Sequence, residues 1–76
     1  MRSNEYVYED HTVYVIFKGS LTSAFIWDND GVQACGNAKQ HTDDDYSEAV
    51  GEDLAIARAY TRYFRKLEKL LVKATT

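Results

Sequence analysis

Three short segments in the first half of the chain are rich in β-branched and aromatic residues, which favour strands. The first two, Thr12–Phe17 and Thr22–Trp27, flank the tight-turn signal Gly19-Ser20. The third, Val32–Lys39, alternates apolar and polar residues and follows the turn Asp28–Gly31, whose glycine supplies the positive φ that such turns need. This pattern predicts a three-stranded antiparallel meander.

The second half of the chain changes to helical periodicity after an acidic loop. Good helix formers dominate from Glu52 onward, and apolar side chains recur at steps of three and four residues. Asp45 and Glu48 have the spacing of a capping box, so we expect a helix from about Tyr46 to about Lys73. The residues expected to face the core are Val50, Leu54, Ala57, Thr61, Phe64, Leu67 and Leu71. The sequence therefore predicts an α+β domain of the type β-β-β-α, with one long C-terminal helix packed on one sheet face.

Both faces of the predicted sheet are apolar, which is more apolar surface than one helix can cover. The side chains that we assign to an apolar interaction surface on the sheet are Tyr14, Ile16, Phe25 and Trp27. The register of the hairpin at Gly19-Ser20 leaves open which strand face is buried. Either the segment Tyr6–Tyr8, which extends the first strand or forms a short separate one, folds over the second face, or that face meets another copy or a partner.

Length and composition indicate a single domain over residues 1–76, with a hydrophobic content of 45% that is sufficient for a core. Cys35 is the only cysteine, so no intramolecular disulfide can stabilise this small domain. Oligomerisation, in the simplest case a homodimer, is the expected additional source of stability. The sequence has neither an export signal nor an apolar run of roughly 20 residues, so we expect a cytoplasmic protein with no membrane partner.

The charges are strongly polarised along the chain, although the formal net charge is only −3. Residues 58–76 contain six basic residues and one acid, whereas the preceding part contains three bases and eleven acids. The six bases fall within a helical arc of roughly 100° and form a basic stripe. The residues of the basic stripe are Arg58, Arg62, Arg65, Lys66, Lys69 and Lys73. Because like charges four residues apart repel, the stripe is either a solvated face or a surface for an anionic partner, phosphate backbone or acidic protein.

Candidate catalytic and metal-binding groups do not form a recognised pattern. The run Asp28–Gly31 resembles the start of a calcium loop, but Lys39 stands at the twelfth position, where a bidentate glutamate is required. The spacing of Cys35 and His41 matches no zinc site, and the acids Asp43–Asp45 are explained by their position ahead of a helix. We therefore expect no metal, no cofactor and no enzymatic activity.

One set of short motifs spans the strand end and the helix. It consists of Gly36-Asn37-Ala38-Lys39, then Asp45-Tyr46, then Gly-x-x-Leu-Ala-x-x-Arg-Ala from Gly51 to Ala59. In these motifs the chain resembles small double-stranded-RNA-binding-domain-like proteins of phages and bacteria, mostly of unassigned function, over roughly Thr12 to Leu67. The resemblance implies the same β-β-β-α unit.

The full domain of that family has a helix before its first strand, and it grips the phosphates of duplex RNA with lysines at the start of its last helix. Only eleven residues precede Thr12 in this chain. The positions that match the lysines are Asp43, Asp44, Asp45 and Glu48. Their charge has the wrong sign for phosphate, so classical recognition of duplex RNA is not expected.

These observations lead to two functional hypotheses. The first is a small non-enzymatic interaction protein, encoded by a phage, that binds and modulates a protein partner such as a host nucleic-acid-handling or defence protein. It rests on the small size, the two apolar sheet faces and the polarised charge. The alternative is nucleic-acid binding through the basic face of the C-terminal helix.

Overall fold

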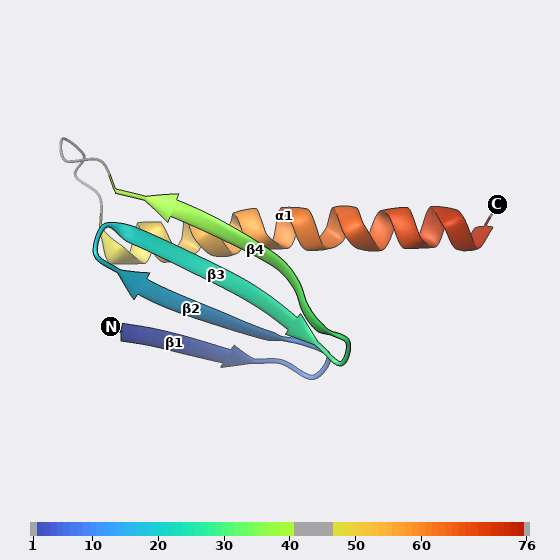
Figure 1. Ribbon diagram of the computed structural model, residues 1–76, viewed down its shortest axis with the longest axis horizontal. Helices are drawn as coiled ribbons and strands as arrows, with labels where there is room; N and C mark the ends of the chain where they lie inside the picture. Colours follow the sequence, from blue (N-terminus) through green and yellow to red (C-terminus); the bar gives the residue numbers. More distant parts are fainter. Residues whose placement is uncertain (1, 41–46, 76) are drawn as a thin grey trace.

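The computed structural model describes residues 2–40 and 47–75. It contains four strands and one helix, namely β1 (Arg2–Val7), β2 (Thr12–Lys18), β3 (Leu21–Asp28), β4 (Gly31–Lys39) and α1 (Glu48–Thr75). The strands form one antiparallel sheet in the order β1-β2-β3-β4, and α1 lies across one face of it (Figure 1). The predicted α+β architecture with a C-terminal helix is confirmed, whereas the predicted number of strands is wrong by one.

The additional strand is β1, which pairs with β2 so that Glu5 lies opposite Tyr14 and Val7 opposite Thr12. It was not predicted over its full length because Arg2–Glu5 is a run of polar residues without a strand pattern. β1 is the outermost strand of the sheet, and nearly all of its residues are exposed. It therefore does not need apolar side chains on both faces. Tyr6 and Val7 thus belong to a separate strand, which was one of the alternatives for this segment. Because β1 extends the sheet sideways, the alternative in which Tyr6–Tyr8 folds over the second sheet face is wrong.

Both predicted tight turns are present between the hairpin strands. Gly19 and Gly31 have φ values of +59° and +103°, a region that favours glycine. The side chain of Asp28 accepts a hydrogen bond of 2.8 Å from the backbone N–H of Asp30, which closes the turn locally. The aspartates of this run therefore act as turn residues, as the turn prediction expects.

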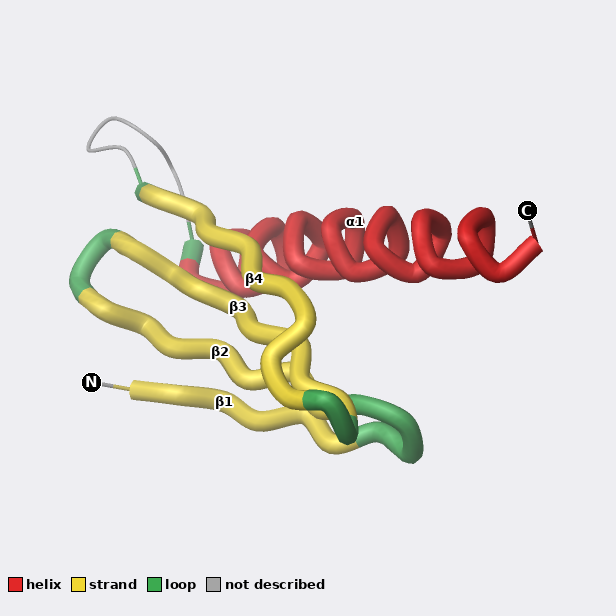
Figure 2. Tube along the Cα trace, turned by 45° about the vertical axis from the view of Figure 1, so that its right-hand side comes forward, coloured by secondary structure: helices red, strands yellow, loops and turns green. Residues whose placement is uncertain are grey.

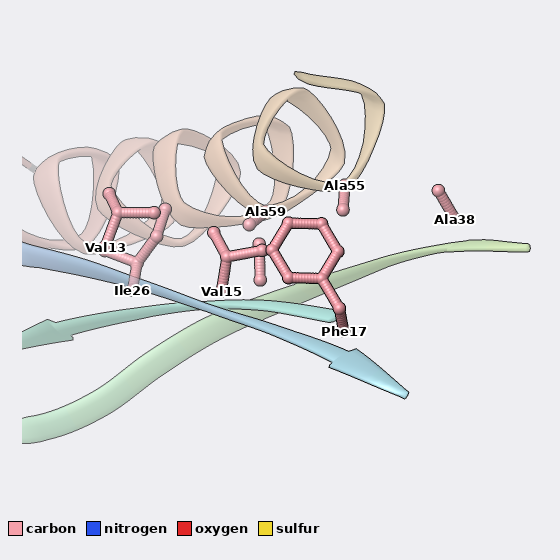
Figure 3. Close-up of a cluster of buried hydrophobic side chains, with 8 residues drawn as sticks. Val13, Val15, Phe17, Ile26, Ala38, Ala55 and Ala59 are labelled. Carbon is pink, nitrogen blue, oxygen red and sulfur yellow. The ribbon is translucent and has the colours of Figure 1, made fainter. Parts of the chain in front are cut away.

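The core lies between α1 and one face of the sheet, as Figure 3 shows. From the strands, Val13, Val15 and Ile26 are almost fully buried against the helix. The other buried strand residues of this cluster are Phe17, Ala24 and Ala38. From the helix, Ala55 and Ala59 are buried in the same cluster, and the larger side chains Ile56, Tyr60 and Tyr63 pack against it while remaining partly exposed. The fully buried positions of the helix are therefore small, whereas most of those on the sheet are larger.

The predicted core face of the helix is wrong. Val50, Phe64 and Leu71 are 55%, 59% and 67% exposed, and Leu54 is 37% exposed. Ala57 and Thr61 are also exposed, and Leu67 is half-buried. The buried helix residues are Gly51, Ala55 and Ala59.

The physical reason is the close approach of α1 to β4. A Cβ atom placed on Gly36 would lie 2.3 Å from the carbonyl oxygen of Ala55 and 2.4 Å from the backbone nitrogen of Ala59. At this separation only small residues fit between the helix and the sheet. The glycine and alanine positions therefore face the sheet directly, Ile56, Tyr60 and Tyr63 pack beside them, and most of the apolar side chains predicted for the core are exposed.

The helix begins and ends two residues later than predicted. The Ser47 hydroxyl accepts a hydrogen bond of 3.2 Å from the N–H of Val50, as expected of an N-cap residue. Asp45, of the predicted capping box, and Tyr46, the predicted start, lie outside the described residues. Near its start the helix is tied to β1, because Arg2 pairs with Glu48 and Tyr6 donates a hydrogen bond to Glu52.

Candidate interaction sites

The face of the sheet opposite α1, called the outer face from here on, carries Tyr14, Ile16, Phe25 and Trp27. Burial alternates along β2 and β3, so these four side chains lie on the same side, which the helix leaves uncovered. Tyr14, Ile16 and Phe25 are half-buried by their neighbours, whereas Trp27 is 46% exposed. The structure thus brings together all four predicted residues and fixes the register that the sequence left open.

Strand register orders the outer face into rows that run across the sheet. One row places Tyr14 opposite Phe25, and Phe25 opposite Cys35. The next row, toward the turn between β3 and β4, places Trp27 opposite Val32. In the other direction, Ser23 donates a hydrogen bond of 2.7 Å to the side chain of Asn37. The outer face therefore has an apolar centre that becomes polar at one end, as interfaces commonly do.

Sequence reasoning missed two apolar neighbours of this centre. Val7 of β1 is 70% exposed and Val32 of β4 is 50% exposed. Val32 lies in a strand that was predicted. A register irregularity between Ile26 and Trp27 of the neighbouring strand interrupts the alternation of side chains between Val32 and Cys35, so the sequence pattern does not place these two residues on the same face. A shallow depression on the same face is lined by Glu5, Thr12, Tyr14 and Trp27.

Half of the basic stripe lies along the outer edge of β4. Arg58 donates a hydrogen bond of 2.7 Å to the carbonyl oxygen of Asn37, and Arg62 donates one of 2.7 Å to that of Cys35. One turn further on, Lys66 donates a hydrogen bond of 2.6 Å to the side chain of Gln33. The three donors are four residues apart on the helix, and their three acceptors are two residues apart on β4, so donors and acceptors lie side by side.

These three bases have a structural explanation that does not require an anionic partner. β4 is an edge strand, and its outward carbonyl groups would otherwise be open to pairing with another strand. The guanidinium groups satisfy these acceptors and place charge along the edge. Arg65 and Lys69, on the same stripe, are exposed.

Replacing Arg62 with alanine is expected to lower the free energy of unfolding by about 1 kcal/mol, the typical value of one hydrogen bond. Arg65→Ala is the matched control, since this exposed arginine lies on the same helix, and we expect a change of less than about 0.5 kcal/mol. Urea denaturation followed by far-UV circular dichroism measures both changes. Equal effects of the two substitutions would contradict the role of Arg62 at the strand edge.

A cluster of aromatic rings lies where the helix leaves the sheet. The ring of His11 stacks on Tyr8 at 4.9 Å and contacts the edge of Tyr60 at 5.6 Å between centroids. Tyr60 in turn stacks on Phe64 at 5.7 Å. This cluster anchors the connection between β1 and β2 to the middle of α1.

His11 also links two polar groups. Its Nδ1 lies 2.7 Å from the carboxylate of Asp10, and its Nε2 lies 2.7 Å from the hydroxyl of Tyr60. The hydrogen bond from His11 lowers the pKa of Asp10, so its carboxylate is ionised at neutral pH and accepts from Nδ1–H. In the neutral ring Nε2 then accepts from the Tyr60 hydroxyl. Burial raises the pKa of Tyr60 above its ordinary value, so the phenol remains protonated.

The structure keeps Cys35 and His11 apart. Cys35 is half-buried on the outer face, whereas His11 contacts residues of the helix on the other side. The candidate ligands His41, Asp43 and Asp45 lie outside the described residues. Within residues 2–40 and 47–75, no group of three or more His, Cys, Asp or Glu side chains is placed to hold a metal ion.

Comparison with known protein families, curated proteins and solved structures gives no match for this chain. Within the part of the chain that the structure describes, no helix combines the length and the apolar character that crossing a membrane requires.

Proposed function

We propose that this protein is a small non-enzymatic interaction module that binds and modulates a protein partner through the outer face of its sheet. The observation that carries this proposal is the apolar centre formed by Tyr14, Phe25 and Trp27 on a face that α1 does not cover. Aromatic side chains that are partly exposed and surrounded by polar groups are typical anchors of protein interfaces. A partner with a complementary apolar patch fits this surface.

The basic stripe supports nucleic-acid binding less well. Arg58, Arg62 and Lys66 are engaged with β4, so binding phosphates would compete with hydrogen bonds inside the protein. The resemblance to double-stranded-RNA-binding-domain-like proteins concerns the fold and says little about activity. We propose a phage protein that acts on a host nucleic-acid-handling or defence protein, on the basis of its small size, its apolar outer face and its polarised charge.

Trp27→Lys is expected to abolish capture of the partner protein, because it places a charge at the centre of the apolar contact. The tagged wild-type protein and each variant are used to capture partners from host cells after nuclease treatment, and recovered proteins are quantified by mass spectrometry. Val50→Lys is the matched control, since Val50 is 55% exposed on the helix and Trp27 is 46% exposed on the sheet. We expect this control to recover the same proteins as the wild type, and Trp27→Lys to reduce them at least about tenfold.

Folding of each variant is checked by circular dichroism, and Val32→Lys provides a second change on the outer face if Trp27→Lys does not fold. Two results would overturn the proposal. One is capture of the same proteins by wild type and both outer-face variants. The other is recovery only of nucleic acid that nuclease removes.

A further inference from the structure

The helix is much longer than the sheet that it covers. With 28 residues, α1 extends over about 42 Å, and it projects beyond the sheet toward the C-terminus (Figure 2). The radius of gyration of 14.0 Å exceeds the roughly 11 Å expected for a compact domain of this length. Every helix residue from Glu68 to Thr75 is exposed. The projecting part of the helix is called the overhang from here on.

The overhang carries an apolar stripe, and one edge of this stripe continues the side of the helix that faces the sheet. Leu70 follows Ala59 by eleven residues, about three turns, so it points in nearly the same direction as this fully buried alanine. Its neighbours in the stripe follow the three- and four-residue spacing of a helix seam. The residues of the overhang stripe are Phe64, Leu67, Leu70 and Leu71.

The stripe is exposed in the single chain. Phe64 is 59%, Leu70 56% and Leu71 67% exposed, whereas Leu67 is half-buried. The last turns of a helix are only marginally stable without tertiary packing, so an unpaired overhang of this length gains stability from a partner. Toward its C-terminus, α1 extends past the ends of the strands, so no strand lies beside this part of the helix (Figure 1).

We propose that the overhang stripe is the dimer interface of this protein, occupied by the same stripe of a second copy in antiparallel orientation. One edge of the stripe, at Leu70, lies on the sheet side of the helix, so a parallel pair would crowd the two sheets at the same end of the dimer. An antiparallel pair places the two sheets at opposite ends of the dimer. A twofold axis between two such stripes makes each Leu and Phe side chain meet apolar side chains of the other copy.

Charge complementarity favours a second copy over an unrelated helix. In the antiparallel arrangement, the C-terminal end of each helix approaches the end of the partner's sheet, where the turns after β1 and β3 lie (Figure 1). These turns carry Glu9, Asp10, Asp28 and Asp30. The last two turns of the helix carry Lys69 and Lys73. Each copy therefore presents bases where the other presents acids, which orients the pair and accelerates association.

Leu70→Glu is expected to raise the dimer dissociation constant at least about tenfold, because twofold symmetry places two carboxylates in the apolar contact. Val72→Glu is the matched control. Val72 is 54% exposed compared with 56% for Leu70, and it lies on the opposite side of the overhang. We expect its dissociation constant to remain within about threefold of the wild type.

Sedimentation equilibrium over a range of concentrations measures the mass, which should rise from the chain mass of 8.7 kDa to twice that value in the wild type. Circular dichroism checks folding, and Leu71→Glu is the second variant if Leu70→Glu does not fold. A wild-type protein that stays monomeric up to about 1 mM would overturn the proposal. So would equal weakening by Leu70→Glu and Val72→Glu. Neither result bears on capture of a partner by the outer face.

Discussion

Gly36→Ala is expected to lower the free energy of unfolding by about 3 kcal/mol or more, because the added methyl group overpacks the contact between β4 and the helix. The added Cβ would lie 2.3 Å from the carbonyl oxygen of Ala55 and 2.4 Å from the nitrogen of Ala59. Both contacts are with helix backbone, which cannot move aside by a side-chain rotation. The helix must therefore shift away from β4, and the contacts of Arg58 and Arg62 with the strand edge are lost with it.

Thermal and urea denaturation of the two proteins measure this change. Asn37→Ala in the same strand is the control, because it removes only one exposed hydrogen bond with Ser23 and should cost less than about 1 kcal/mol. A Gly36→Ala protein as stable as the wild type would show that α1 does not lie as close to β4 as described. If the variant does not fold, a strong reduction of helical signal at low temperature supports the same conclusion.

Ile26→Ala is expected to cost about 3 kcal/mol, within the range for a buried isoleucine that leaves a cavity. Ile26 is fully buried between the sheet and α1, in contact with a core that has few large side chains. A domain of this size has little stability in reserve, so a loss of this magnitude unfolds a substantial fraction of the protein.

Ile16→Ala provides the matched comparison, since Ile16 has the same side chain on the outer face and is half-buried. We expect a cost of about 1 kcal/mol for the single chain, because little packing is lost. Urea midpoints of the two variants give the comparison directly, and Ile26→Val gives a graded value if Ile26→Ala is unfolded. Equal costs at the two positions would contradict the assignment of the inner and outer faces.

Strand segments and turns could be predicted from local sequence because their causes are local. Glycine is required at Gly19 and Gly31 by positive φ, and β-branched residues favour the extended backbone of Val13–Phe17. The four residues of the outer face were also predicted, since alternation along a strand is a property of the backbone. Only the end of β1 was anticipated, as a possible short strand at Tyr6–Tyr8, because the polar residues Arg2–Glu5 carry no strand pattern and their pairing with β2 is set by the turn that joins the two strands.

The sequence by itself determined the secondary structure of the second half and its charge, but the orientation of the helix was decided by tertiary structure. Hydrophobic periodicity predicted one core face, made mostly of larger apolar residues. The close approach at Gly36 overturned this prediction, because small residues such as Gly51, Ala55 and Ala59 fit closest against the sheet. The same contact turned half of the basic stripe toward the strand edge, which no pattern of charges along the chain could reveal.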